Sequence, residues 1–522
     1  MKKININTYL KIVGLVLISV LAISCEEFLD TAPDNRAEVD TKEKITSLLV
    51  SAYSNYNPAM MTEMSTDNVM DNGSNFRVDY KEQEEAYFWR QITEQRGDCP
   101  KSIWDGYYKA IASANQALSA IEEMGNPDEL KAQRGEALIT RAFNHFTLLN
   151  VFSLHYNPQT SAQDMGIPYS EEPETVPVVK YGRGAVAQAY EKINKDIEEA
   201  LPLIDDNIYS VPKYHFNRKA AYAFAARFNL YYLKYDKVIE YASIALGENP
   251  ASLLRNMQLY APLGADDIQN KYVQDSEPAN FLILPAYSVW GRISANSYGR
   301  RYAHNRVITA NETYWAMGPW GTSGSSGLLI SKLYGVNEQV RFPNFDEFWE
   351  YTDKAAGIGY PHTVWVAFTA DETILCRAEA YAMKGEYDKA ASDLNLWQNS
   401  KCKTGVPTLT KDRINTFFSS IDYKPIKITA DNQRTIKYKL NPLGFKVAEG
   451  DQENFIHCVL HFRRLETIRS GLRWFDIKRY GIEIAHNHEG KEDDVLLLDD
   501  PRRALQLPLE VISAGLPANP HQ

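Results

Sequence analysis

Residues 371–398 read DETILCRAEAYAMKGEYDKAASDLNLWQ and predict two packed helices joined by a turn. Ala378, Tyr381, Gly385, Ala390 and Leu394 have the spacing of a tetratricopeptide repeat, in which small side chains let paired helices approach closely. A second stretch has the same period but also fits a generic helical hairpin; it comprises Ala226, Val238, Ala242, Ala245 and Pro250. Both stretches predict a scaffold rather than a reactive site.

Helical periodicity extends through much of the rest of the chain. Apolar residues recur at steps of three and four from Ile103 to Ile121 and from Val186 to Ile204. A further helix is expected from Asp128, with an apolar stripe at Leu138, Ala142, Phe146 and Leu149. Strands and helices do not alternate strongly. The expected fold class is therefore mainly α, a tetratricopeptide-repeat-like helical scaffold with long irregular, loop-rich excursions.

The composition of the chain limits the classes of protein to which it can belong. The chain has 522 residues, 44% hydrophobic and 24% charged, so it can bury a sizeable core. The net charge is −11 without any basic block, which argues against a nucleic-acid partner. Five cysteines lack the CxxC spacing, and neither a zinc site, a disulfide framework nor a cofactor is expected.

Two short motifs superficially resemble ligand sites but are expected to be ordinary loops. Gly182-Arg183-Gly184 precedes a helix, but without a parallel sheet a loop and helix start are expected rather than a dinucleotide site. His486-Asn487-His488-Glu489, followed by Asp493-Asp494, has poor spacing for a metal site and is expected to be a solvated loop.

The amino terminus has the features of an export signal. Lysines precede a twelve-residue apolar run, residues 12–23, which is too short to cross a bilayer as a helix. Residues 21–25, LAISC, resemble a bacterial lipobox, so residues 1–24 are expected to be removed and Cys25 acylated. Glu26-Glu27 resembles the signal that sends some lipoproteins to the outer face of the outer membrane.

Composition changes near Gln258. From there to about Pro361 the sequence is rich in glycine and aromatic residues, and long irregular segments on a rigid scaffold often carry binding residues. Trp290, Tyr298, Trp315 and Trp320 are therefore expected to include a stacking platform for a ligand. The alternative, that these aromatics fill the underside of a long loop, has equal weight.

Residues 462–481, FRRLETIRSGLRWFDIKRYG, resemble the signature of the SusD/RagB family of nutrient-uptake lipoproteins. Similar family features are residues 504–510, the Asn519-Pro520 end, Trp104-Asp105-Gly106-Tyr107-Tyr108 and residues 134–143. Ser470 departs from the family, which usually has Glu before the glycine. Within this motif, Arg473, Asp476 and Arg479 are expected to form structural ion pairs around Trp474 rather than a ligand site.

The resemblance implies a surface-exposed, outer-membrane lipoprotein without catalytic activity. Such a protein captures oligosaccharides, or less often peptides, as the hinged lid of a SusC-like TonB-dependent transporter. It also implies a SusD-like amino-terminal region, residues 25–257, and a carboxyl-terminal region, residues 258–522, that contains the ligand-binding excursion. Asp71, Asn75 and Arg77 are expected to provide hydrogen bonds to sugar hydroxyls.

Two other classes of function remain open on sequence alone. A secreted glycoside hydrolase needs two carboxylates facing each other across a cleft, and a pair such as Asp353 and Asp371 has no supporting motif. A repeat scaffold that binds only proteins or peptides would account for the helices, but it would leave the aromatic loop region without a role.

Overall fold

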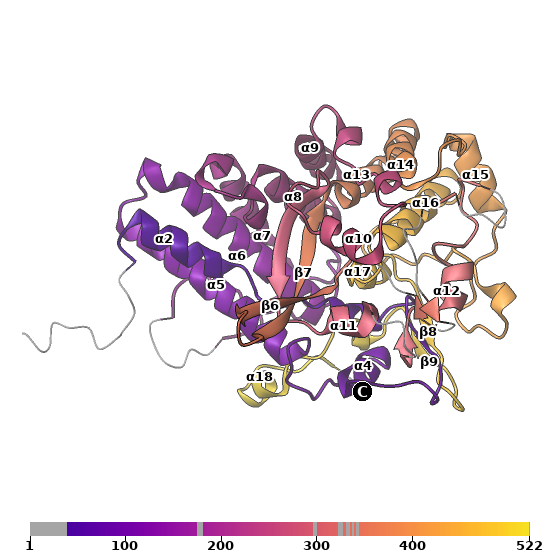
Figure 1. Cartoon of the computed structure of the whole chain (residues 1–522), viewed down its shortest axis with the longest axis horizontal. Coiled ribbons are helices and arrows are strands. Elements are labelled where there is room, and N and C mark those ends of the chain that lie inside the picture. The colour runs from indigo at the N-terminus through magenta and orange to yellow at the C-terminus, as the bar shows by residue number, and fades with distance from the viewer. Residues whose placement is uncertain are drawn as a thin grey trace, which may run out of the picture. The chain divides into compact units, whose positions relative to one another are not determined.

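The computed structural model describes residues 39–174, 181–295, 300–321, 327–329, 335–336, 339–340 and 344–520 (Figure 1). Lys42–Gln522 forms one compact unit, and the composition change near residue 258 falls within it. The expected signal peptide, residues 1–24, and Cys25 lie outside the described residues.

Long paired helices form the body of this unit, as the fold class predicted. In Figure 1, α5, α6 and α7 lie side by side in the amino-terminal half, and α8, α9, α13 and α14 continue the packing. α13 also packs against α16. The bounds are α5 Pro100–Glu123, α6 Lys131–Phe152, α7 Val186–Ala200, α8 Arg218–Tyr231, α9 Tyr235–Leu246, α13 Ala370–Met383, α14 Tyr387–Lys401 and α16 Asp451–Glu466.

Both repeat-like stretches form helical hairpins. α13 and α14 are joined at Gly385, whose φ of +76° lies in the left-handed region that a side chain disfavours. Ala378, Ala390 and Leu394 are completely buried between the helices. α8 and α9 pair in the same way through Ala226 and its neighbours. Small residues at these contacts let the helices approach closely, which confirms the expected scaffold.

The other periodic stretches are helices too. α5 begins with Pro100 at its first turn, where the missing N–H needs no partner. Its buried stripe includes Ile103, Ile111 and Ile121. α7 begins directly after the Gly182–Gly184 segment, so that segment is a loop and helix start as expected.

A three-stranded antiparallel sheet stands within the region that sequence composition predicted to be irregular. Its strand order is β2–β7–β6, with bounds Asn280–Ala286, Ile358–Thr369 and Glu347–Asp353. β2 and the last three residues of β7 are largely buried, whereas β6 and the start of β7 extend to the surface. The sheet thus connects the helical body to an exposed hairpin.

Short elements complete the described chain. Two-stranded pairs are β1 with β3, β4 with β5 and β8 with β9, with bounds Met70–Asp71, Tyr302–Ala303, Gly335–Val336, Gln339–Val340, Ile484–His486 and Asp494–Leu496. The short helices are α2 Lys42–Leu49, α3 Ala59–Met64, α4 Lys81–Tyr87, α10 Ala265–Tyr272, α11 Trp290–Ala295, α12 Arg306–Asn311, α15 Lys411–Ser419, α17 Leu472–Arg479 and α18 Leu509–Ser513.

The 462–481 motif spans the end of α16, a tight turn and α17. Trp474 is fully buried, Arg463 binds Asp476 at 3.0 Å, and Arg479 binds Asp476 at 2.9 Å. These ion pairs confirm the expected structural role. A side-chain atom at Gly471 would lie 1.9 Å from the Thr62 hydroxyl of α3, so this turn requires glycine.

Candidate functional site

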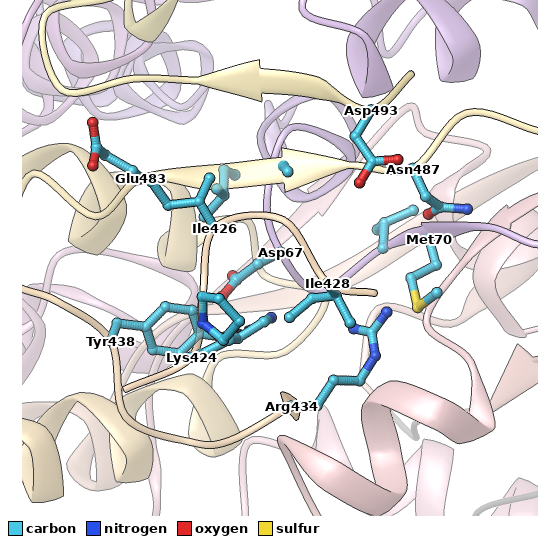
Figure 2. Close-up of a pocket in the computed structure, with 14 residues that line it drawn as sticks. Asp67, Met70, Lys424, Ile426, Ile428, Arg434, Tyr438, Glu483, Asn487 and Asp493 are labelled. Atoms are coloured by element: carbon cyan, nitrogen blue, oxygen red, sulfur yellow. Dashed lines mark hydrogen bonds between the residues drawn. The ribbon is translucent and has the colours of Figure 1, made fainter. Parts of the chain in front are cut away.

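A small pocket, partly open to solvent, lies beside the β8–β9 hairpin (Figure 2). Segments far apart in the sequence meet there: the turn before β1, the loop after α15 and the β8–β9 hairpin. The residues that line it are Asp67, Val69, Met70, Lys424, Pro425, Ile426, Ile428, Arg434, Tyr438, Glu483, Ile484, Ala485, Asn487 and Asp493.

A buried carboxylate, Glu312, holds the cationic side of the pocket in place. Its Oε2 accepts hydrogen bonds from Lys424 Nζ at 2.7 Å and from the Tyr438 hydroxyl at 2.9 Å. Its Oε1 accepts from Arg434 Nη1 at 2.8 Å. Burial alone would raise the pKa of Glu312, but Lys424, Arg464 and Arg434 outweigh it and lower that pKa to about 2. Glu312 is therefore ionised and fixes both cations.

A second buried carboxylate, Asp67, ties the pocket to the 462–481 motif. It accepts two hydrogen bonds from Arg473, at 2.9 and 3.0 Å, and lies 3.5 Å from Arg464. Burial opposes its ionisation, but the two arginines hold its pKa well below the ordinary value. Paired carboxylates and guanidinium groups of this kind fix side chains in one geometry, so this side of the pocket is preorganised.

The two walls of the pocket have different chemistry. Figure 2 shows Glu483 and Asp493 on the side of the β8–β9 hairpin, with Lys424 and Arg434 on the opposite side. Ionised carboxylates only accept hydrogen bonds, whereas lysine and arginine only donate them. Apolar side chains between the walls, including Met70 and Ile426, provide non-polar contact area. The pocket thus suits a ligand that both donates and accepts hydrogen bonds.

The side of the pocket that carries Glu483 and Asp493, here called the acceptor wall, is held in place by a buried histidine. His486 stacks between Tyr87 and Trp89, with ring centroids 4.1 and 4.2 Å away, and its Nε2 lies 2.9 Å from the Thr66 carbonyl. Burial lowers its pKa to about 4. The expectation of a solvated loop is wrong for His486, because its ring packs between two core aromatic rings and is buried there.

The predicted hydrogen-bonding segment, residues 71–77, borders the pocket without lining it. Asp71 is buried, and its carboxylate accepts from Arg301 Nε at 2.7 Å and from Arg301 Nη2 at 2.8 Å. Asn75 is exposed. The side chain of Arg77 is 63% exposed and binds Asp79 at 2.7 Å. The Asp71 carboxylate is thus already occupied by Arg301, whereas Asn75 and Arg77 are open to solvent.

The predicted aromatic platform divides into separate environments. Trp290 and Trp320 are 3% and 1% exposed and belong to the hydrophobic core. The Trp290 indole N–H donates to the Arg469 carbonyl at 2.8 Å, and the Trp320 ring packs against Phe462. Neither ring presents a face to a ligand, which favours the alternative that these two fill the underside of the loop region. Trp315 is 42% exposed, and Tyr298 lies outside the described residues.

Sequence reasoning missed the residues that form the pocket walls. Lys424 and Arg434 belong to a polar stretch without periodicity, and their shared partner Glu312 is more than a hundred residues away. The acidic cluster of residues 489–494 was a usable signal, but its short-range pattern fits an ordinary turn equally well. The acidic pair Asp353 and Asp371 forms no cleft, because Asp371 is buried and binds Lys401 at 2.7 Å while Asp353 is exposed on β6.

Neither a metal cluster nor a spanning helix is evident in the described residues. Among them, no group of three or more His, Cys, Asp or Glu side chains is placed to hold a metal ion. In the same part of the chain, every helix is too short or too polar to cross a bilayer.

The fold defines a class: a helical-repeat body that supports a polar pocket. Residues 27–230 match the model of the SusD-like family, described as starch-binding and associating with the outer membrane. No curated protein matches the chain. Residues 27–230 are therefore similar in sequence to the SusD-like family, and the solved structures below extend the likeness to the fold of nearly the whole chain.

Three solved structures illustrate that likeness. A SusD superfamily protein from Bacteroides thetaiotaomicron has 17% identity and a TM-score of 0.59, over 91% of this chain and 98% of its own. A SusD-like carbohydrate-binding protein from Bacteroides vulgatus has 14% identity and a TM-score of 0.60, over 85% and 84%. A laminarin-binding SusD-like protein has 15% identity and a TM-score of 0.56, over 92% and 100%.

Proposed function

We propose that this chain is a surface-exposed, lipid-anchored protein that captures oligosaccharides and delivers them to a SusC-like TonB-dependent transporter. The observation that carries the proposal is the pocket of Figure 2, which has carboxylates on one side and cations on the other within a SusD-like fold. The match of residues 27–230 to a family described as starch-binding supports the choice of ligand class.

Sugar chemistry fits both walls. Each hydroxyl of a sugar donates one hydrogen bond and accepts others, so Glu483 and Asp493 accept from it while Lys424 and Arg434 donate to it. Hydrogen bonds to charged groups are stronger than neutral ones, and the buried partners of Lys424 and Arg434 keep these donors in place. Ile426 is 36% exposed and offers apolar contact to the C–H face of a sugar ring.

The predicted sites outside the pocket take subordinate roles in this proposal. Trp315 is retained as a stacking residue because its ring is open to solvent, and Asn75 and Arg77 are retained as polar neighbours on the adjoining surface. Asp71 positions that surface through Arg301. Trp290 and Trp320 serve stability rather than binding.

Anchoring and delivery follow from the sequence resemblance. Acylation of Cys25 holds the protein on the outer membrane, and more than one acyl chain is needed for stable retention. The helical body covers the transporter as a hinged lid through a polar surface, and no catalytic step is involved. Lid opening and closing then controls access to the bound sugar.

A panel of polysaccharides and oligosaccharides, including starch and laminarin, tests the class of function. We expect the protein to retain at least one member and to release no reducing ends from any. Release of reducing ends would favour a glycoside hydrolase. Absence of retention across the panel, together with binding of proteins or peptides, would favour a repeat scaffold for polypeptide partners.

A further inference from the structure

A row of tyrosines lies on the surface beside the β6–β7 hairpin. Tyr56, Tyr287 and Tyr360 come from three distant parts of the chain. The ring centroids of Tyr56 and Tyr287 are 6.0 Å apart, and those of Tyr287 and Tyr360 are 5.8 Å apart. Tyr287, in the middle, is 46% exposed, and the other two are partly exposed. None of the three lines the pocket of Figure 2.

Backbone hydrogen bonds hold the row together. The Tyr287 N–H donates to the Asn55 carbonyl at 2.8 Å, which joins the segment before Tyr56 to the end of β2. Tyr360 lies on β7 opposite Glu350 of β6, and β7 also pairs with β2. The backbone segments that carry the three rings are therefore already joined, so a ligand would not have to order these segments.

Two glycines allow the tyrosines to lie close to the helical body. A side-chain atom at Gly106 of α5 would lie 2.3 Å from the Tyr56 ring, and one at Gly97 would lie 2.8 Å from the Tyr287 carbonyl oxygen. Directly beneath, the Asp98 carboxylate accepts from the Ser288 hydroxyl at 2.6 Å and from the Val289 N–H at 2.8 Å. The turn after β2 is thus fixed from below while the Tyr287 ring stays exposed.

The aromatic surface continues along the hairpin with polar groups at its edge. The His362 ring lies 6.3 Å from Tyr360, and the Phe348 ring lies 6.2 Å from His362. Glu350, on the same face, lies directly opposite Tyr360 across the hairpin. A line of flat rings bordered by hydroxyl and carboxylate groups matches a chain of sugar rings, whose C–H faces stack on aromatics while their hydroxyls need polar partners.

We propose that Tyr56, Tyr287 and Tyr360 form a second glycan-binding surface, which holds consecutive rings of a longer chain. The inference rests on the proposed function for the class of ligand, but it assigns a site that shares no residue with the pocket. The pocket binds short oligosaccharides, and the tyrosine row adds affinity only for chains long enough to cover several rings.

Tyr287→Leu and Tyr287→Ala test the row. Leucine keeps apolar bulk but removes the aromatic face, so the variant stays folded, while Tyr214→Ala is a matched control because Tyr214 is 49% exposed elsewhere. Retention is measured by electrophoresis in gels containing starch or laminarin, and affinity for short oligosaccharides of the same chain by calorimetry. We expect roughly two- to tenfold weaker retention for both Tyr287 variants, with unchanged affinity for short oligosaccharides and no effect of Tyr214→Ala.

The outcomes separate this inference from the proposed function. Wild-type retention by both Tyr287 variants overturns the second surface and leaves the pocket proposal standing. An equal loss for short and long ligands also overturns it, because the row would then belong to a single site. Absence of polysaccharide retention and of oligosaccharide binding by the wild-type protein contradicts both proposals.

Discussion

Replacing Trp290 or Trp320 by alanine should lower the free energy of unfolding by roughly 3–5 kcal/mol, the usual cost of truncating a buried tryptophan. Their rings are 3% and 1% exposed, so nearly the whole side chain would leave a cavity. Trp315→Ala is the matched control: its ring is 42% exposed, and the expected loss is below roughly 0.5 kcal/mol. Glycan affinity should be unchanged in the folded Trp290 and Trp320 variants.

Phenylalanine substitutions separate packing from hydrogen bonding. Trp290→Phe removes the hydrogen bond to the Arg469 carbonyl, a loss of about 0.5–1.5 kcal/mol beyond the change in volume. Within the described residues, no acceptor contacts the Trp320 indole N–H, so Trp320→Phe has no such additional cost. The order of stability should therefore be wild type, Trp320→Phe and then Trp290→Phe.

Denaturant unfolding followed by circular dichroism measures these differences, with the slope m checked for constancy. The reasoning is refuted if Trp290→Ala unfolds at the wild-type denaturant concentration but loses glycan affinity. That result would return Trp290 to the ligand platform and would mean that its ring becomes accessible in solution.

Three further predictions concern the anchor, the partner and acid stability. Cys25→Ala should abolish labelling by a fatty acid and outer-membrane fractionation, and equal labelling of the variant and the wild type would contradict the lipid anchor. A SusC-like transporter encoded nearby should copurify in mild detergent, and recovery of the lipoprotein alone would count against the lid. Because Glu312 has a folded-state pKa of about 2 against an ordinary value of 4.5, its contribution to stability is present above pH 4.5 and is lost as the pH falls toward 2. Glu312→Gln should reduce this acid dependence below pH 4.5, and an unchanged stability profile between pH 4.5 and pH 2 would contradict the assignment.

The helices were predictable because their signal is local. The Ala378–Leu394 spacing and the apolar steps from Ile103 to Ile121 reflect the helical period, and both became packed helices. The β2–β7–β6 sheet was missed because β2 is a short, largely buried run, which periodicity cannot distinguish from a helix. Glycine and aromatic composition near it suggested loops instead.

The site was less predictable, because its chemistry depends on distant partners. Asp71 looks like a free hydrogen-bonding residue until Arg301, 230 positions later, occupies its carboxylate. Composition likewise detects tryptophans without indicating burial, so Trp315 and Trp320 could not be separated. Glu312 has no local motif, yet it fixes both Lys424 and Arg434.

The most direct test of the account is a calorimetric titration of the protein with an oligosaccharide that the glycan panel retains. The comparison is between wild type, a Glu483→Gln, Asp493→Asn double variant, and Glu492→Gln, an exposed acid of the same hairpin that does not line the pocket. Loss of two charged acceptors should weaken binding roughly tenfold or more, with Glu492→Gln unchanged. A wild-type Kd for the double variant would contradict capture of the sugar in this pocket.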